Sequence, residues 1–251
     1  MSERTNEGTT TDTVDFVTIK QRETISMQLQ KSICQIKGKL TGTGFFCYIN
    51  YENKNIPCLM TNYHVLDDKY IKDNNKIEKI IINNNKINII INIEDIIYKS
   101  KKDEYDLIII KLKEGEEYMK NINYLELDDN LFNKDSLKGY ESIYILHYLN
   151  EQNASVSYGK DIIYDPNYKY DIQYKCNTLF NSSGGPILNL LTNKIIGIHK
   201  GCIQTNDGIK YNIATFLKYP LKEINNNNLY NNYNIELKNI LIKRLHLNNL
   251  S

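Results

Sequence analysis

About a dozen short apolar segments, separated by polar turns, constrain the fold of this chain more than any other feature. Most of them are rich in Ile, Val, Tyr or Phe, which favour β-strands, and helical periodicity is almost absent among them. So many short strands predict an all-β sandwich or barrel. We expect strands at residues 32–37, 43–50, 56–61, 77–82, 86–92, 106–112, 142–148, 154–164, 171–176, 186–190, 194–199 and 209–215.

The two ends of the chain differ from this strand-rich middle. Residues 1–20 are polar at their start and are expected to form a flexible arm, followed by a folded domain over residues 21–224. Residues 225–251 begin with an Asn-rich linker and continue as an amphipathic helix, which either docks on the domain or binds a partner or a membrane surface. The apolar residues at helical spacing are Ile235, Leu237, Ile240, Leu241, Leu245 and Leu247.

Charge and hydropathy exclude several classes of partner. The formal net charge is +1, so the chain has no basic field that would attract nucleic acid. The sequence has no apolar run long enough to cross a bilayer and no secretory signal near residue 1. We therefore expect an intracellular protein with no nucleic-acid partner and no membrane span.

Neither a metal site nor a cofactor site is expected. The four His are spread along the chain, and the Cys residues do not stand at metal-ligand spacing. Gly42 and Gly44 lack the rest of a phosphate-binding loop. The five Cys are odd in number, so free thiols are expected, although Cys47 and Cys58 can pair across a hairpin in an oxidising compartment.

Three short segments carry residues suited to nucleophilic catalysis. His64 follows an apolar strand end at Leu59–Thr61, and Asp106 stands at the mouth of a strand that is apolar on both faces. Ser183 lies in a tight loop and is followed by Gly184–Pro186, small residues that let a backbone approach a substrate closely.

The chemistry proposed for each of these three residues depends on the other two. A Ser hydroxyl attacks an amide only when an adjacent base takes its proton and a third group orients that base. A carboxylate at Asp106 is costly to bury unless a group such as the His64 imidazole bonds to it. We therefore predict that Ser183 is the nucleophile, His64 the general base and Asp106 the orienting group. Asp103 and Glu104 remain alternatives to Asp106.

The three segments resemble the trypsin-like, or chymotrypsin-fold, serine peptidase superfamily. Thr61–Val65, Asp106–Ile109 and Ser182–Pro186 match its His, Asp and Ser motifs in the family's chain order. The resemblance implies two antiparallel six-stranded β-barrels, at about residues 30–115 and 120–220, with the three residues in the cleft between them. It also implies an oxyanion hole formed by the backbone N–H groups of Ser183 and Asn181, although the family usually has Gly at the latter position.

Within the superfamily, the chain is most similar to the bacterial glutamyl endopeptidases and their intracellular relatives. The resemblance implies that Thr178 and His199 bind an acidic substrate side chain and that Gly201 belongs to the substrate site, so cleavage would follow Glu or Asp. A hydroxyl and an imidazole can both donate hydrogen bonds to a carboxylate.

The expected function is therefore that of a serine endopeptidase acting on proteins or peptides without a cofactor. Ser182 stands where digestive members have an Asp that pairs with a new N-terminus, so that mode of activation is not expected. The enzyme is either active as made or controlled by a regulatory partner. The alternative function is an inactive barrel that binds peptides or scaffolds a partner, and the Asn at position 181 is its main support.

Overall fold

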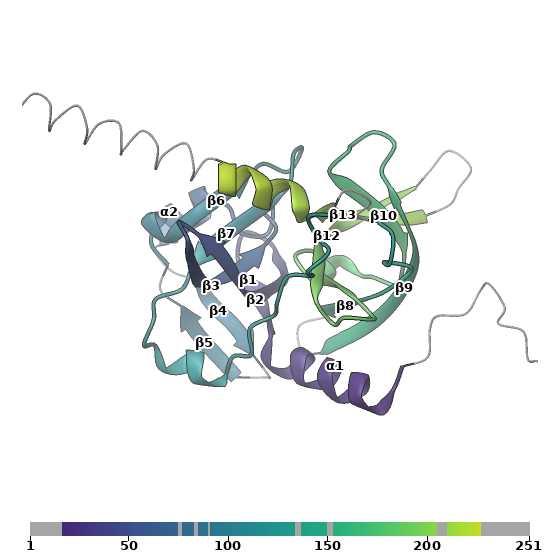
Figure 1. Ribbon diagram of the computed structural model, residues 1–251. Helices are drawn as coiled ribbons and strands as arrows, with labels where there is room; N and C mark the ends of the chain where they lie inside the picture. The colour runs from purple at the N-terminus through teal and green to yellow at the C-terminus, as the bar shows by residue number, and fades with distance from the viewer. Residues whose placement is uncertain are drawn as a thin grey trace, which may run out of the picture.

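The structure is a computed structural model that describes residues 17–74, 77–82, 85–89, 91–133, 137–149, 153–204 and 210–226. Its strands form two β-structures that lie side by side (Figure 1). The predicted arm up to residue 16 lies outside the described residues, as do the rest of the predicted Asn-rich linker and the predicted terminal helix, from residue 227 onward.

The first β-structure is a seven-stranded antiparallel sheet with the order β5-β4-β1-β2-β3-β7-β6. The sequence predicted a six-stranded barrel here and missed β6, a short strand with only one fully buried residue. Among the described residues, no pairing joins the end strands β5 and β6. The strands are β1 (Ile33–Lys37), β2 (Thr41–Tyr51), β3 (Lys54–Thr61), β4 (Ile77–Ile82), β5 (Asn85–Ile89), β6 (Ile96–Ser100) and β7 (Leu107–Lys111).

The second β-structure is a closed antiparallel barrel with the order β10-β13-β12-β11-β8-β9, which agrees with the predicted six strands. Its residues alternate between the barrel interior and the outside, and closure leaves no free sheet edge. The strands are β8 (Ser142–Tyr148), β9 (Ala154–Tyr164), β10 (Asp171–Lys175), β11 (Pro186–Asn189), β12 (Ile195–Gln204) and β13 (Lys210–Phe216).

A helix that the strand pattern did not predict, α1 (Ile19–Lys31), packs against the second barrel (Figure 1). Thr18 and Gln21 form a capping box at its start, which satisfies backbone N–H groups there. Gln21 Nε2 and Gln28 Nε2 each donate to a carbonyl oxygen after β11, at 2.9 Å. Two polar side chains therefore fix a helix that has little apolar periodicity, and they explain why the sequence did not reveal it.

The remaining helical segments are short. Helix α2 (Asp68–Asn74) begins where the Tyr70 N–H donates to the Asp67 carboxylate at 2.7 Å. Residues 218–226 form a helix directly after β13. The 3₁₀ turns are η1 (Ile93–Asp95), η2 (Glu117–Asn121) and η3 (Phe180–Ser182). None of the described helices is long and apolar enough to span a membrane.

Candidate functional site

His64 and Asp106 meet because they flank two paired strands. His64 follows β3, Asp106 precedes β7, and the two strands pair with Thr61 opposite Ile108. The imidazole Nδ1 lies 2.6 Å from Asp106 Oδ2, and the His64 backbone N–H donates to Oδ1 at 3.0 Å. The carboxylate is 1% exposed and the imidazole 16%. The structure therefore pairs His64 with Asp106.

The backbone of Asp106 is held in an uncommon conformation. Its φ is +50°, in the left-handed region that Asp tolerates better than most residues. Its carbonyl oxygen accepts from the Tyr63 N–H at 3.2 Å and from Asn62 Nδ2 at 2.9 Å. Sequence reasoning missed the role of Asn62, whose only signal was a polar residue between an apolar strand and His64.

The loop that carries Ser183 is fastened to the first sheet by Thr43. The Thr43 N–H donates to the Ser183 carbonyl at 2.8 Å, and its hydroxyl donates to the Asn181 carbonyl at 2.8 Å. A Cβ on Gly42 would lie 2.9 Å from the Ser183 carbonyl oxygen and 2.6 Å from the Val65 side chain. Gly42 therefore lies where the segment of His64 and the loop of Ser183 come together.

Gly184 allows this close approach. Its φ is +88°, and a Cβ there would lie 2.1 Å from the Thr43 carbonyl oxygen. The Gly184 N–H donates to the His199 carbonyl at 2.9 Å, which ties the other side of the loop to β12. Only glycine both adopts this positive φ without strain and leaves room for the Thr43 carbonyl oxygen.

The Ser183 hydroxyl has a partner other than His64. Its Oγ donates to the carbonyl oxygen of Lys200 at 3.3 Å, and the described hydrogen bonds include none between Ser183 and His64. Catalytic hydrogen bonds are often long or unformed in a free enzyme and tighten when substrate binds.

The turn before Ser183 has the type I conformation. Phe180–Ser182 form a 3₁₀ turn, in which the Ser182 N–H donates to the Leu179 carbonyl at 3.0 Å. Positive φ occurs at five non-glycine residues in the described part of the chain, and Asn181 is not one of them. A type II turn would need positive φ at Asn181 and would rotate the preceding peptide group to face the other way.

A buried histidine supports the same turn from behind. The Ser182 hydroxyl accepts the Leu179 N–H at 2.9 Å and lies 2.6 Å from His147 Nδ1. His147 Nε2 lies 3.0 Å from the Ser157 hydroxyl. Burial lowers the pKa of His147 to about 4, so its imidazole is neutral at pH 7. Only the tertiary structure connects His147, on β8, with the residue beside Ser183.

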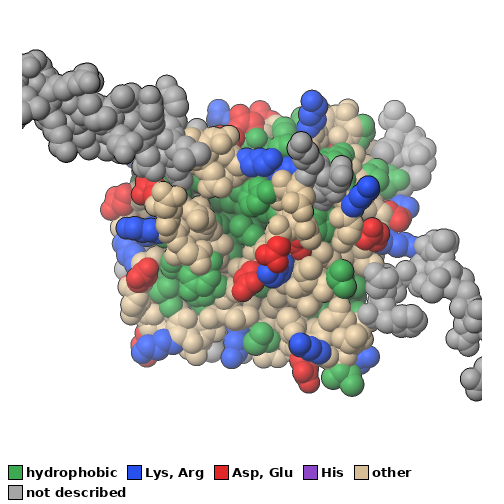
Figure 2. Space-filling model, viewed as in Figure 1, with side chains coloured by type: hydrophobic (Ala, Val, Ile, Leu, Met, Phe, Trp, Pro, Cys, Tyr) green, Lys and Arg blue, Asp and Glu red, His purple; other side chains and the backbone are tan. Residues whose placement is uncertain are grey.

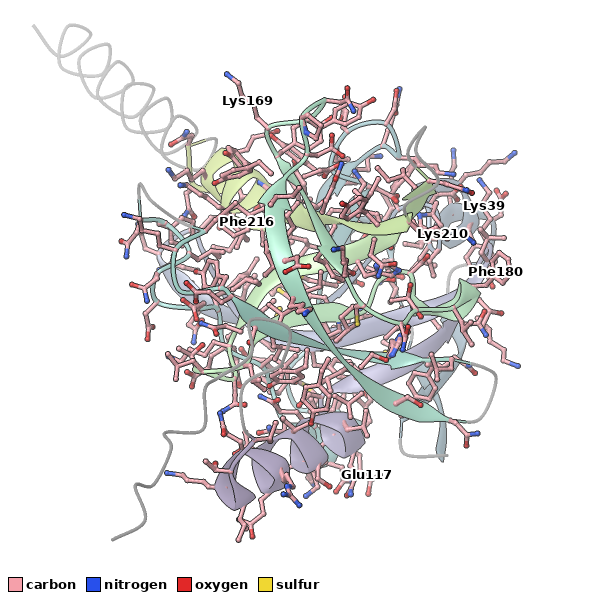
Figure 3. The ribbon with its side chains drawn as sticks, turned by 90° about the vertical axis from the view of Figure 1, so that its right-hand side faces the viewer. Lys39, Glu117, Lys169, Phe180, Lys210 and Phe216 are labelled. Atoms are coloured by element: carbon pink, nitrogen blue, oxygen red, sulfur yellow. The ribbon has the colours of Figure 1, made fainter. Side chains whose placement is uncertain are left out.

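An open cavity of about 870 Å³ lies beside the Ser183 loop. Thr178 lines it, and the Thr178 hydroxyl donates to Asn212 Oδ1 at 2.7 Å. Among the described residues, no acidic side chain lines it, whereas three lysines do, namely Lys160, Lys175 and Lys210, of which Lys175 pairs with Asp161 at 3.0 Å. Figure 3 shows Lys210 on the same side of the molecule as Phe180, which belongs to the turn before Ser183.

The other two predicted substrate residues lie elsewhere. Gly201 lines a neighbouring cavity of about 220 Å³ together with Asp106. His199 lines neither cavity; it is 2% exposed, and its Nδ1 lies 2.6 Å from the Tyr174 hydroxyl. Burial lowers the pKa of His199 to about 3, so it can offer only a neutral imidazole.

No group of three or more His, Cys, Asp or Glu side chains that could hold a metal ion occurs within the described ranges. The Cys residues are all free thiols, including Cys47 and Cys58, which face each other directly across β2 and β3.

The surface charge is mixed. Figure 2 shows positive and negative side chains interspersed over the face in view.

A model of the trypsin-like peptidase domain matches residues 42–198 of this chain. Similar solved structures include an HtrA-type protease, AlgW, with a decapeptide: TM-score 0.51, 16% identity, and coverage of 74% of this chain and 51% of that one. This chain therefore spans about half the length of AlgW. A thermostable serine protease, AL20, from an extremophilic microorganism has a TM-score of 0.54 at 11% identity, with coverage of 78% and 95%. These likenesses show the fold. No curated protein sequence matches the chain.

Proposed function

Because the chain belongs to the family of trypsin-like peptidase domains, we propose that it is a serine endopeptidase acting through an acyl-enzyme intermediate. The observation that carries the proposal is the buried Asp106 carboxylate, 2.6 Å from His64 Nδ1, beside a Ser183 loop bonded to the same sheet. A buried carboxylate on one imidazole nitrogen leaves the other nitrogen free to accept a proton.

The proposed reaction has two halves. His64 Nε2 takes the hydroxyl proton while Ser183 Oγ bonds to the substrate carbonyl carbon, and His64 then gives that proton to the leaving amine. Water attacks the acyl-enzyme in the second half, again with His64 as the base. Asp106 keeps the imidazole in one orientation and stabilises the imidazolium, without becoming protonated.

The oxyanion would bind to the backbone N–H groups of Ser183 and Asn181. Pre-aimed donors of this kind stabilise the developing negative charge. Because the turn at Phe180–Ser182 is of type I, the peptide group between Phe180 and Asn181 has to rotate before its N–H faces the opposite way. In the proposed active state, the turn at Phe180–Ser182 is therefore of type II.

Labelling with a fluorophosphonate probe tests the proposal. We expect the wild-type protein to be labelled covalently, and Ser183→Ala and His64→Ala to abolish the labelling. Ser26→Ala, an exposed position on α1, is the matched control and should label like the wild type. A folded wild-type protein that is not labelled would contradict the proposal, as would undiminished labelling of Ser183→Ala.

We further propose that substrates carry Glu or Asp immediately before the scissile bond. The cavity beside the Ser183 loop supports this preference, since Thr178 and three lysines line it and no acidic side chain in the described part of the chain does. His199 is buried and lines neither cavity, and the Tyr174 hydroxyl lies 2.6 Å from its Nδ1, so the lysines and not His199 support this preference.

Paired peptides that differ only by Glu or Gln before the scissile bond test this specificity. We expect faster cleavage after Glu, and a smaller advantage at high salt because ions screen exposed lysines. Lys210→Met should reduce the advantage of Glu, whereas Lys169→Met, which lies away from the cavity at the top of Figure 3, should not. Equal cleavage of both peptides would contradict an acidic specificity.

A catalytically inactive, peptide-binding barrel is the second candidate. Two observations favour it: the type I turn at Asn181 and the engagement of the Ser183 hydroxyl by the Lys200 carbonyl. This candidate predicts that peptides bind to the folded protein without being cleaved and that the probe does not label Ser183. The labelling experiment therefore separates the two functions.

A further inference from the structure

Side chains of the second barrel hold the segment that leads into Asp106. This segment, residues 101–105, joins β6 to β7 in the first sheet, and residues 101–104 are exposed. Three successive carbonyl oxygens in it accept hydrogen bonds from the second barrel. The pairs are Tyr170 Oη with Asp103 O at 3.2 Å, Lys200 Nζ with Glu104 O at 2.8 Å, and Thr215 Oγ1 with Tyr105 O at 2.6 Å.

Asp171 holds two of these donors, Lys200 and Thr215. Its carboxylate lies 2.9 and 3.2 Å from Lys200 Nζ and 3.3 Å from the Thr215 hydroxyl, and its side chain is only 4% exposed. Burial raises the pKa of Asp171, and the Lys200 ammonium opposes that rise. The same ammonium lies 5.6 Å from the centre of the Tyr170 ring. A buried carboxylate with two such partners is rigid, because leaving either charge unpaired is costly.

We infer that Tyr170, Asp171, Lys200 and Thr215, which we name the Asp171 clamp, are positioning residues for Asp106; this rests on the proposed function. The φ of +50° at Asp106 costs about 1 kcal/mol or more, so this backbone persists only where its surroundings determine it. Part of this restraint is local, since the Asp106 N–H donates to the Lys101 carbonyl at 2.8 Å and the Asp106 carbonyl accepts from the first sheet. The clamp adds restraint from the other barrel on the three carbonyls just before Asp106.

The clamp also reaches the nucleophile. The carbonyl of Lys200 accepts the Ser183 hydroxyl, while its side chain holds the segment before Asp106. Lys102, Asp103 and Asp106 line the small cavity beside Asp171 and Lys200, and Asp165 is a further acidic neighbour of Asp171. Packing of the two β-structures against each other does not by itself require hydrogen bonds to three successive carbonyl oxygens. The last of these carbonyls belongs to Tyr105, the residue directly before Asp106.

Substitutions at Thr215 test the inference without changing any charge. Thr215→Val removes the hydroxyl at nearly constant shape, and Thr215→Ser keeps it. The first readout is the far-downfield ¹H NMR signal of the proton on His64 Nδ1, which reports the contact with Asp106 and needs no turnover. We expect Thr215→Ser to keep this signal and Thr215→Val to shift or lose it.

The second readout is the kinetics. We expect Thr215→Val to lower kcat on the order of 10- to 100-fold with little change in KM, as for a displaced catalytic group. The acidic limb of its pH–rate profile should move to lower pH, because the imidazolium loses an aligned carboxylate. Thr215→Ser should restore both. The charge-neutral double variant Lys200→Met with Asp171→Asn should behave like Thr215→Val.

Tyr144→Phe is the matched control, since it removes a buried 2.6 Å hydrogen bond between the second barrel and α1, away from the clamp. It should lower stability but leave the NMR signal and the pH–rate profile unchanged. A Thr215→Val protein that keeps the wild-type signal and kcat would overturn the inference. If the wild type lacks probe labelling, the proposed function fails, and the NMR comparison still decides whether the clamp positions Asp106.

Discussion

The Thr43 hydroxyl donates a hydrogen bond to the carbonyl oxygen of Asn181 at 2.8 Å and so joins the first sheet to the loop that carries Ser183. The same hydroxyl accepts the backbone N–H of Tyr148 at 3.0 Å. Thr43 is fully buried, so neither bond competes with solvent. One side chain of β2 therefore connects the half that carries His64 with two segments of the second barrel.

Thr43→Val should destabilise the protein and slow probe labelling. It leaves the Tyr148 N–H and the Asn181 carbonyl without this hydroxyl, and an unmatched buried polar group costs about 1–3 kcal/mol. Urea unfolding and the rate of fluorophosphonate labelling check this. Thr43→Ser keeps the hydroxyl and should retain most of both properties; equal losses in the two variants would mean that the hydroxyl is not the cause.

Asp106→Asn should nearly abolish turnover without unfolding the protein. An amide cannot stabilise the imidazolium and favours the wrong tautomer of His64, which costs about 10³–10⁴-fold in kcat. Asn tolerates the left-handed backbone as well as Asp does, so the thermal midpoint should change little. Asp103→Asn is the control and should stay within about twofold of the wild type in kcat. The opposite ranking would make Asp103 the orienting group.

Asn181→Gly should speed probe labelling, and Asn181→Ala should slow it. Positive φ at this position converts the type I turn to type II, and it is easiest for Gly and hardest for Ala. A backbone cost of about 1 kcal/mol corresponds to roughly a fivefold change in rate each way. Labelling kinetics of the three proteins at equal probe concentration give the order. An order other than Gly, Asn, Ala would show that this turn does not limit acylation.

Stability should fall as the pH is lowered from about 6.5 toward 4, partly through His147. Its folded pKa of about 4 lies below the usual value of 6.5, so the unfolded chain binds a proton that the folded chain excludes. The stabilisation is complete above pH 6.5 and is lost as the pH falls through 4. His147→Gln should lessen this pH dependence by about 3 kcal/mol. Urea unfolding of both proteins at pH 7 and pH 4 checks it; parallel losses would exclude His147 as the cause.

Local sequence patterns determined most of the architecture. Runs such as Ile143–Leu146 and Leu107–Ile110 are short, rich in Ile and bounded by polar residues, which favours strands over helices. All the predicted strand segments overlap observed strands. The sequence did not predict strand β6 or helix α1, because neither has a strong apolar periodicity. Gln21 and Gln28 hold α1 in place through hydrogen bonds to carbonyl oxygens far along the chain.

The sequence alone also singled out His64, Asp106 and Ser183, because each stands in a distinctive local setting of strand end or glycine-flanked loop. Only the tertiary structure decided which groups surround them. Asn62, His147, Lys200 and Thr215 act through hydrogen bonds whose partners are 35 to 110 residues away. Such bonds depend on which backbone atoms two packed barrels bring within about 3 Å, a property of the folded whole that local residue patterns do not encode.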